Sequence, residues 1–382
     1  MSAPPVMDVD AVLDTAKILV CCGSGGVGKT TTAAALALRA AERGRRTVVL
    51  TIDPARRLAQ SMGLTELDNT PRTVAGADTA AGGSLDAMML DMKRTFDDIV
   101  LAHADGPKAQ AIFENPFYQA LSSSFAGTQE YMAMEKLGQL KATGDYDLIV
   151  VDTPPTRSAL DFLDAPERLT TFLDGRMIRI LLAPAKAGGK AYFKVVTTGF
   201  TVFTSVITRI IGAQVLQDVS QFVGSLETMF GGFRERAQGT YDLLKAPGTA
   251  FVVVAAPERD ALREAAYFVE RLAEESMPLA GLVVNRVHRS GTAVLTPERA
   301  LAGAQSLDEQ GGHELTAAVL RLHADRVSLA ARERRLQERF CGAHPGVPVV
   351  EVAALPGDVH DLDGLRAVGE DLASGVAAAV PA

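Results

Sequence analysis

A glycine-rich run near the start of the chain ends in a lysine and a threonine, with the pattern G-x-x-x-x-G-K-T over residues 23–30. Glycines let successive backbone N–H groups turn inward around an anion with no Cβ in the way. Lys29 adds a full positive charge at the β- and γ-phosphates, and the Thr30 hydroxyl suits Mg²⁺. The pattern therefore predicts a site for a nucleoside triphosphate with Mg²⁺. The residues expected to contact the nucleotide are Gly23, Ser24, Gly25, Gly26, Val27, Gly28, Lys29, Thr30 and Thr31.

Two aspartates follow apolar runs further along the chain. Asp53 ends the run 47–53 and precedes Pro-Ala-Arg-Arg. From there it can orient and polarise a water toward the γ-phosphate, although Asp before Pro is also a common helix N-cap, and both roles can hold. Asp152 follows four hydrophobic residues, and we expect its carboxylate to hold Mg²⁺, usually through water. Thr30 and Asp152 are therefore the expected metal residues, and Lys29 and Asp53 the catalytic ones.

The elements that must position these residues follow from the apolar runs. Near-continuous apolar runs separated by helical patterns predict an α/β fold, with a doubly wound, mostly parallel sheet and a P-loop core. Ligands of such sheets bind beyond the carboxyl ends of the strands, which is where Asp53, Asp152 and Asn285 fall. The expected strands cover 17–22, 47–53, 148–152, 250–255, 279–285 and 347–352, with a weaker candidate at 84–90.

Two stretches without strand patterns interrupt this core. We predict a core of residues 1–92, 146–156 and 246–382, and a helical subdomain of residues 93–145 and 157–245. Its apolar residues recur every three to four positions, and this spacing predicts amphipathic helices. They either pack on each other or form a surface for an apolar partner. The two stripes are Phe200, Phe203, Val206, Ile207, Ile210 and Ile211, and Val215, Val219, Phe222, Leu226, Met229, Phe230 and Phe233.

Composition narrows the function classes. A net charge of −8 in 382 residues, with no basic run, argues against nucleic-acid binding. No apolar run approaches the roughly 20 residues of a membrane span, and the first ten residues lack a signal-peptide pattern. The three cysteines form no C-x-x-C pair, so neither a zinc clasp nor a disulfide framework is expected. We expect a cytoplasmic protein without an integral membrane segment.

Three segments together, Gly-Gly-Val-Gly-Lys-Thr-Thr, Thr-Ile-Asp-Pro-Ala and Val-Asp-Thr-Pro-Pro-Thr, resemble the ArsA family of ATPases. This family includes the arsenite-pump ATPase and the guided-entry targeting factor for tail-anchored proteins. The resemblance extends over most of the chain, whose length is similar to that of the bacterial single-domain "anion-transporting ATPase" type. It implies ATP/ADP and Mg²⁺ as cofactors, Asp53 as the water-polarising acid of switch I, and Asp152 in switch II. Asn285 falls at the family's adenine-recognising asparagine, and Pro356 in a loop that closes over the base.

The resemblance also implies a dimer, either a homodimer or a heterodimer with a paralogous ATPase, whose helical subdomains can bind a hydrophobic protein client. Ser24 stands where the family has a signature lysine that reaches the nucleotide across the dimer. Without this lysine, turnover would be slow or another residue would supply the cation. The candidates are Arg56, Arg57 and Arg157. One alternative is a catalytically weak regulatory subunit paired with an active paralogue. Another is a MinD/ParA-like positioning ATPase, which the acidic charge and the Ala/Val-rich tail disfavour.

Overall fold

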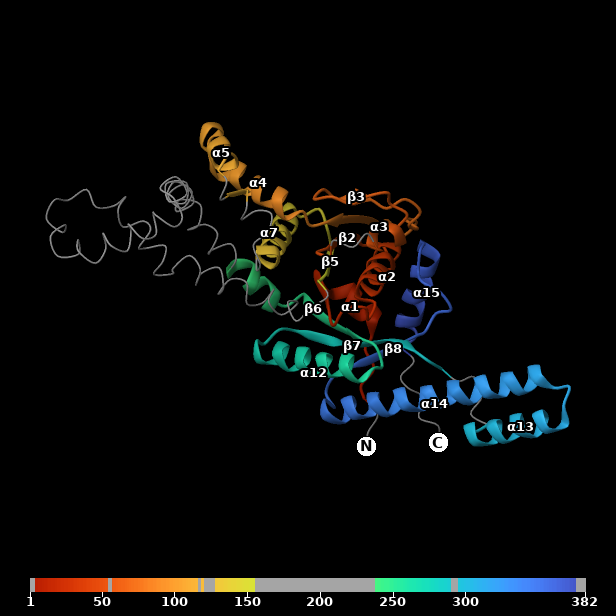
Figure 1. The fold of residues 1–382 in the computed structure, drawn as a ribbon. Coiled ribbons are helices and arrows are strands. Elements are labelled where there is room, and N and C mark those ends of the chain that lie inside the picture. Colours follow the sequence, from red (N-terminus) through yellow and green to blue (C-terminus); the bar gives the residue numbers. More distant parts are fainter. Residues whose placement is uncertain are drawn as a thin grey trace, which may run out of the picture. The chain divides into compact units, whose positions relative to one another are not determined.

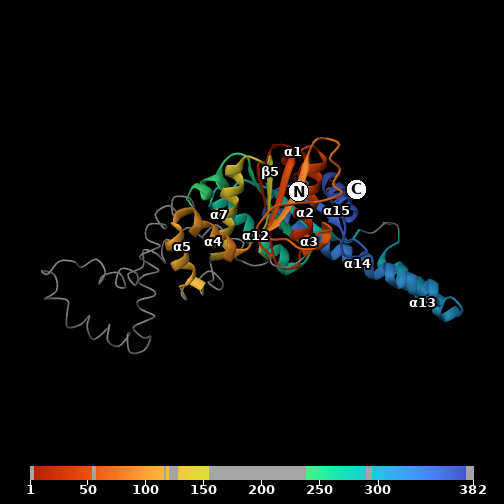
Figure 2. The ribbon, with the colours of Figure 1, turned by 90° about the horizontal axis from the view of Figure 1, so that it is seen from above.

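The computed structural model describes residues 4–53, 57–115, 118–119, 128–154, 238–289 and 295–375. The chain forms two compact units, drawn in Figures 1 and 2. Unit 1 comprises residues 1–89, 143–160 and 244–382, and unit 2 comprises residues 90–142 and 161–243. Both predicted apolar stripes, at 200–211 and 215–233, lie outside the described residues.

Unit 1 is built on an eight-stranded sheet with the order β3-β4-β2-β5-β1-β6-β7-β8. All neighbouring strands pair in parallel except β3 with β4. This confirms the predicted α/β fold with a mostly parallel sheet, and only the two-residue strand β3 lacked a signal in the sequence. The strands are β1 (Ile18–Cys22), β2 (Arg46–Thr51), β3 (Arg72–Thr73), β4 (Ser84–Met89), β5 (Leu148–Asp152), β6 (Thr249–Ala255), β7 (Leu279–Val287) and β8 (Val349–Ala353).

The central strands are buried on both faces. Every residue of β1 and β5 is buried, and six of the seven residues of β6 are as well. Helices cover both faces of a parallel sheet, so its strands consist of continuous apolar residues rather than alternating ones. Each fully buried Val, Leu or Ile stabilises the fold by roughly 1.5–3 kcal/mol. The sheet therefore holds the carboxyl ends of β1, β2 and β5 firmly side by side.

The helices of unit 1 lie on both faces of the sheet. In Figure 1, α1 (Val9–Thr15), α2 (Lys29–Glu42) and α15 (Leu362–Ala373) lie on one face, and α12 (Arg259–Glu274) and α14 (Glu314–Ala343) on the other. The short helix α3 (Arg57–Ser61) packs beside α2. Helix α15 extends to Ala373.

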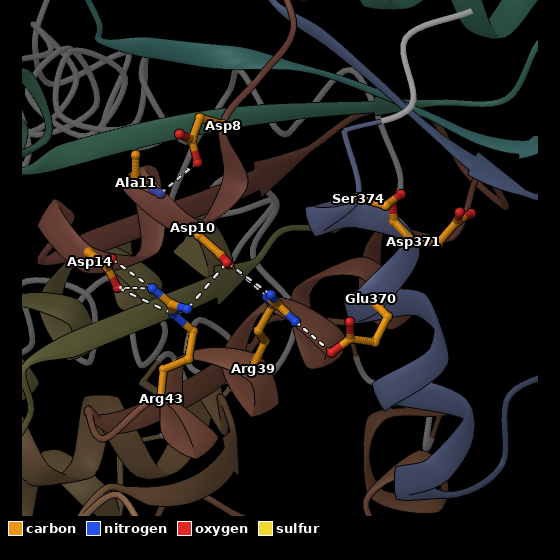
Figure 3. A network of polar contacts seen from close by, with 9 residues as sticks. All are labelled: Asp8, Asp10, Ala11, Asp14, Arg39, Arg43, Glu370, Asp371 and Ser374. Atoms are coloured by element: carbon orange, nitrogen blue, oxygen red, sulfur yellow. Dashed lines mark hydrogen bonds and ion pairs between the residues drawn. The ribbon is translucent and has the colours of Figure 1, made fainter. Parts of the chain in front are cut away.

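A charged network fastens α1 and α15 to α2 (Figure 3). Asp10 accepts hydrogen bonds from Arg39 at 2.7 and 2.9 Å and from Arg43 at 3.2 Å. Arg39 also donates to Glu370 of α15 at 2.9 Å. The Arg39 guanidinium lowers the pKa of the Asp10 carboxyl. These ion pairs fix the two flanking helices against the helix that begins at the phosphate loop.

Helices α13 (Pro297–Gln310) and α14 form an antiparallel hairpin at the edge of the sheet (Figures 1 and 2). Ala300 and Ala304 of α13 and Ala317 and Ala324 of α14 are buried, and small side chains of this kind allow close approach of two helices. Helix α13 ends before Gly311, which has φ +73°. Helix α14 also packs on α12.

In unit 2 the structure describes α4 (Met92–His103), α5 (Gly106–Phe113) and part of α7 (Thr128–Thr143). Tyr118 packs edge-on against Phe96 and donates a hydrogen bond of 2.5 Å to Asp97. Burial raises the pKa of the Tyr118 hydroxyl. Among the helices that the structure describes, none is long and apolar enough to cross a membrane.

Candidate functional site

The predicted phosphate loop connects β1 to α2 as expected. Gly23 has φ +147°, and a Cβ there would overlap the carbonyl oxygen of Val254 on β6. Gly28, the residue before α2, has φ +94°. Both glycines are therefore required by geometry, since L side chains rarely adopt these conformations. Gly25 and Gly26 are exposed, and so the loop is open where a phosphate would lie.

Lys29 is the first residue of α2 and is only 5% exposed. Its Nζ donates a hydrogen bond of 2.7 Å to the carbonyl oxygen of Ser24. Burial lowers the pKa of the lysine, while the nearby carboxylates of Asp152 and Asp53 raise it. The charge of Lys29 is thus held inside the loop, at the helix N-terminus, where the macrodipole also favours an anion.

Asp152 lies at the end of β5 and is fully buried. Its Oδ2 accepts hydrogen bonds from the hydroxyls of Thr30 (2.8 Å) and Thr51 (2.9 Å). Burial raises the pKa of Asp152 to about 6, against the opposing effect of these two hydrogen bonds. Oδ1 is buried without a hydrogen-bond partner in the described part of the chain.

The unpartnered Oδ1 of Asp152 is the observation that tests the fit of Mg²⁺. A buried carboxylate oxygen without a partner is costly, and a hard cation with oxygen ligands satisfies it. The Thr30 hydroxyl donates a hydrogen bond to the other oxygen of this carboxylate, so the two predicted metal residues are in direct contact. Their oxygen atoms fit Mg²⁺, which prefers one or two protein oxygens together with water and phosphate.

Asp53 lies just beyond the end of β2, the strand adjacent to β5. Its backbone N–H donates to the Thr51 hydroxyl at 3.2 Å, and its charge acts on Lys29 and on Asp152. The structure therefore brings Asp53 to the same edge of the sheet as the loop. The candidate cations Arg56 and Arg157 lie outside the described residues, as does the side chain of Arg57.

Asn285 reaches the phosphate loop from β7. Its Nδ2 donates a hydrogen bond of 2.8 Å to the carbonyl oxygen of Val27, and a Cβ on Gly28 would overlap this Nδ2. Pro356 is exposed in the segment between β8 and α15. The structure thus brings Asn285 to the loop, and the role of Pro356 over the base stays a prediction.

Comparison with known proteins places the chain in a family. The family model described as "Anion-transporting ATPase" matches residues 16–293, which include the phosphate loop, Asp53, Asp152 and Asn285. The chain belongs to the anion-transporting ATPase (ArsA) family. It is therefore a member of a family of ATPases, as its sequence motifs predicted.

Curated relatives of this ATPase include "ATPase ARSA2" of Chlamydomonas reinhardtii, 28% identical over 275 residues that cover 69% of this chain and 66% of the relative. "ATPase GET3" of Podospora anserina is 27% identical over 268 residues, covering 69% of this chain and 71% of the relative. "ATPase ASNA1 homolog 1" of Paramecium tetraurelia is 26% identical over 275 residues, covering 72% and 75%. The chain thus aligns with about two thirds to three quarters of these relatives.

The sequence did not reveal every residue of this candidate site. Thr51 shares the Asp152 carboxylate with Thr30 and also accepts from the Asp53 N–H, so it joins the two acids. Thr153 donates to the Cys21 carbonyl at 2.9 Å and ties the residue after Asp152 to β1. Thr51 precedes Asp53 by two residues, and this spacing, which puts two side chains on one side of an extended chain, was the available signal for Thr51.

Proposed function

We propose that this chain binds Mg-ATP at residues 23–31, hydrolyses it, and acts as a nucleotide-dependent switch. The main support is the Asp152 carboxylate. One of its oxygens accepts hydrogen bonds from Thr30 and Thr51, and the other has no hydrogen-bond partner among the described residues. Members of this family are ATPases, and this arrangement fits a site for Mg²⁺ and phosphate.

In this mechanism each residue has one role. The backbone N–H groups of the loop and Lys29 neutralise the phosphates, and the fixed position of Lys29 minimises reorganisation during the reaction. Thr30 and Asp152 hold Mg²⁺, which when bound screens the charge of the β- and γ-phosphates. Asp53 accepts a hydrogen bond from the attacking water and orients it for in-line attack. Asn285 contacts the adenine base, as the family resemblance implies, and Pro356 belongs to a loop that closes over it.

The proposal also covers how the nucleotide site is coupled to a protein partner. Thr51 bonds both to Asp152 and to the Asp53 N–H, so a change at the phosphate reaches the ends of β2 and β5 together. The segments that begin at Asp53 and Asp152 act as switch I and switch II, as the family resemblance implies. They report the nucleotide state to the helical subdomain, which binds a hydrophobic protein client in the cytoplasm. The chain acts as a homodimer or as a heterodimer with a paralogous ATPase.

Ser24 supports a second candidate function. The family's signature lysine is absent at this position, so a charge that stabilises the transition state is missing; such cations contribute about 10³- to 10⁵-fold in rate in related chemistry. A weakly active regulatory subunit, paired with an active paralogue, accounts for this substitution.

Steady-state hydrolysis of Mg-ATP over a series of protein concentrations separates the two candidates. Turnover per chain that rises with concentration supports a self-dimer that completes the site. Tight Mg-ATP binding without turnover at any concentration supports the regulatory subunit. Absence of both binding and turnover contradicts both candidates.

A further inference from the structure

The last residues of β7 depart from regular strand geometry. The pairing of β7 with β8 shifts register between Val284 and Val287, and Arg286 has φ +65°. A non-glycine residue in this left-handed region costs about 1 kcal/mol or more, and it persists only where surrounding contacts hold it. The end of β7 therefore depends on contacts with other elements.

This distortion directs Asn285 toward the phosphate loop. The Asn285 Oδ1 accepts a hydrogen bond of 2.9 Å from the Arg286 N–H, which fixes the orientation of the amide. The Nδ2 group is then free to donate to the Val27 carbonyl oxygen at 2.8 Å. Because Val27 immediately precedes Gly28 and the start of α2, this hydrogen bond ties the end of β7 to the turn of the phosphate loop.

A buried carboxylate from α14 holds the segment that follows the distortion. Glu333 Oε2 accepts a hydrogen bond of 2.9 Å from the His288 N–H, and Oε1 lies 2.8 Å from His288 Nδ1. The Glu333 side chain is only 8% exposed. Hydrogen bonds to a charged, buried acceptor are stronger than neutral ones, and loss of the acceptor leaves the His288 N–H unpaired.

A second anchor fixes the next residue. Arg289 donates to Asp371 of α15 at 3.1 Å and to the Glu351 carbonyl at 3.3 Å. Asp371 also accepts from the Ala353 N–H at 2.6 Å. The segment after β7 is thus tied to α14, to α15 and to β8, and the strained Arg286 lies between these anchors and Asn285.

We propose that Glu333 is a positioning residue for nucleotide binding, which acts through His288 and Asn285 on the phosphate loop. This inference rests on the proposed function, because it requires the loop to bind Mg-ATP. Glu333 touches no part of the nucleotide. It fixes the backbone of His288, and thereby the Arg286 conformation that presents Asn285 Nδ2 to the Val27 carbonyl.

The first test compares the Mg-ATP affinity of Glu333→Ala and Glu333→Gln by calorimetry. Glu333→Ala removes both acceptors and is expected to weaken binding about tenfold, since loss of one charged hydrogen-bonding group commonly costs that much. Glu333→Gln retains one oxygen for the His288 N–H, and its amide can donate to His288 Nδ1. Its affinity is expected to stay within about twofold of the unmodified chain.

Gln337→Ala is the matched control. Gln337 lies one turn further along α14, is 7% exposed, and its Nε2 has no partner in the described part of the chain. Its replacement disturbs the packing of the same helix without touching the His288 contact. Mg-ATP affinity is expected to be unchanged, and thermal unfolding of both alanine variants measures any general loss of stability.

A double-mutant cycle tests whether Glu333 acts through Asn285. Glu333→Ala added to Asn285→Ala should cause little further loss, because the orienting contact has already been removed. Fully additive losses, equal losses in Glu333→Ala and Gln337→Ala, or unchanged affinity in a folded Glu333→Ala would overturn the inference. Absence of Mg-ATP binding in the unmodified chain would instead overturn the proposed function.

Discussion

Lys29 and Asn285 both contact the phosphate loop, but they reach it in different ways. Lys29 lies five positions after its acceptor residue, Ser24, in one continuous motif. Asn285 comes from a strand 258 residues away from Val27, and its orientation depends on a strained neighbour and on Glu333 of another helix. The contact of Lys29 needs only the strand and the helix on either side of the loop. The contact of Asn285 also depends on the positions of β7 and of the elements that hold the end of β7.

This difference suggests a division of roles between the two regions. In the proposed mechanism, Lys29 and the Mg²⁺ that Thr30 and Asp152 would hold provide the positive charge for the chemistry. By our proposal, the end of β7 positions the loop, and the contacts of His288 and Arg289 that hold this end can be altered by substitution. Substitutions at the loop should therefore abolish activity, and substitutions near β7 should tune it.

The largest expected effect belongs to Lys29→Ala. Removal of the buried charge beside the phosphates is expected to lower Mg-ATP turnover about 10³-fold, because a fixed cation stabilises the developing charge. Steady-state phosphate release measures this. Lys17→Ala is the control. Lys17 is exposed and directly precedes β1, at the end of the strand away from the phosphate loop, so this variant should retain full turnover. Turnover that survives in Lys29→Ala would place the chemistry elsewhere.

Asp53→Asn should separate binding from chemistry. The neutral amide polarises the attacking water less than a carboxylate does, so turnover is expected to fall about 10²-fold. The Kd for Mg-ATP should stay within about twofold, since Asp53 lies outside the loop motif. Calorimetry and phosphate release on one preparation give both values. Unchanged turnover would remove Asp53 from the mechanism.

Asp152→Asn should stabilise the metal-free chain in a pH-dependent way. Burial raises the pKa of Asp152 from 3.8 to about 6, so the charged form is unfavourable in the fold. The contribution of this carboxyl to stability is present below its ordinary pKa and is lost as the pH rises through about 6. Asn avoids that loss, so the variant should be more stable by roughly 1–3 kcal/mol at pH 8 and by little at pH 4.

Urea unfolding in EDTA at the two pH values measures this difference. Asp147→Asn is the control of opposite sign. Hydrogen bonds from Arg46 lower the pKa of Asp147 to about 2, so its replacement should destabilise the chain at pH 8. A destabilised Asp152→Asn at pH 8 would mean that the Asp152 charge is compensated in the fold.

The smallest expected effect lies in the network around α2. Asp10→Asn removes the ion pairs to Arg39 and Arg43 and is expected to cost about 0.5–1 kcal/mol at pH 7. Arg39 lowers the pKa of Asp10, so this stabilisation is present above the ordinary value of 3.8 and is lost as the pH falls through the lowered pKa. Asp363→Asn, at an exposed residue of α15, should have a smaller effect in the same unfolding assay. An equal loss of stability in Asp10→Asn and Asp363→Asn would mean that the network does not stabilise the fold.

The sequence predicted the parts of the site that depend on local chemistry. The loop 23–30, the strand before it and the acids that end β2 and β5 all follow from residue type and spacing. Its signals for the rest were weaker. Glu333 is one of several charged residues on a long helix, and only the fold shows that it is buried against His288. The Arg286 distortion has no signature, because arginine is not a residue that favours a positive φ. Such features depend on tertiary contacts between distant segments.

The central claim is that Asp152 and the loop form a site for Mg-ATP. Calorimetric titration of the nucleotide-free chain with ATP, in Mg²⁺ and in EDTA, tests it most directly. We expect one saturable site per chain, with ATP bound at least about tenfold more tightly in Mg²⁺. In Asp152→Ala this Mg²⁺ dependence should disappear. Equal ATP affinity with and without Mg²⁺ in the unmodified chain, or no saturable binding, would contradict it.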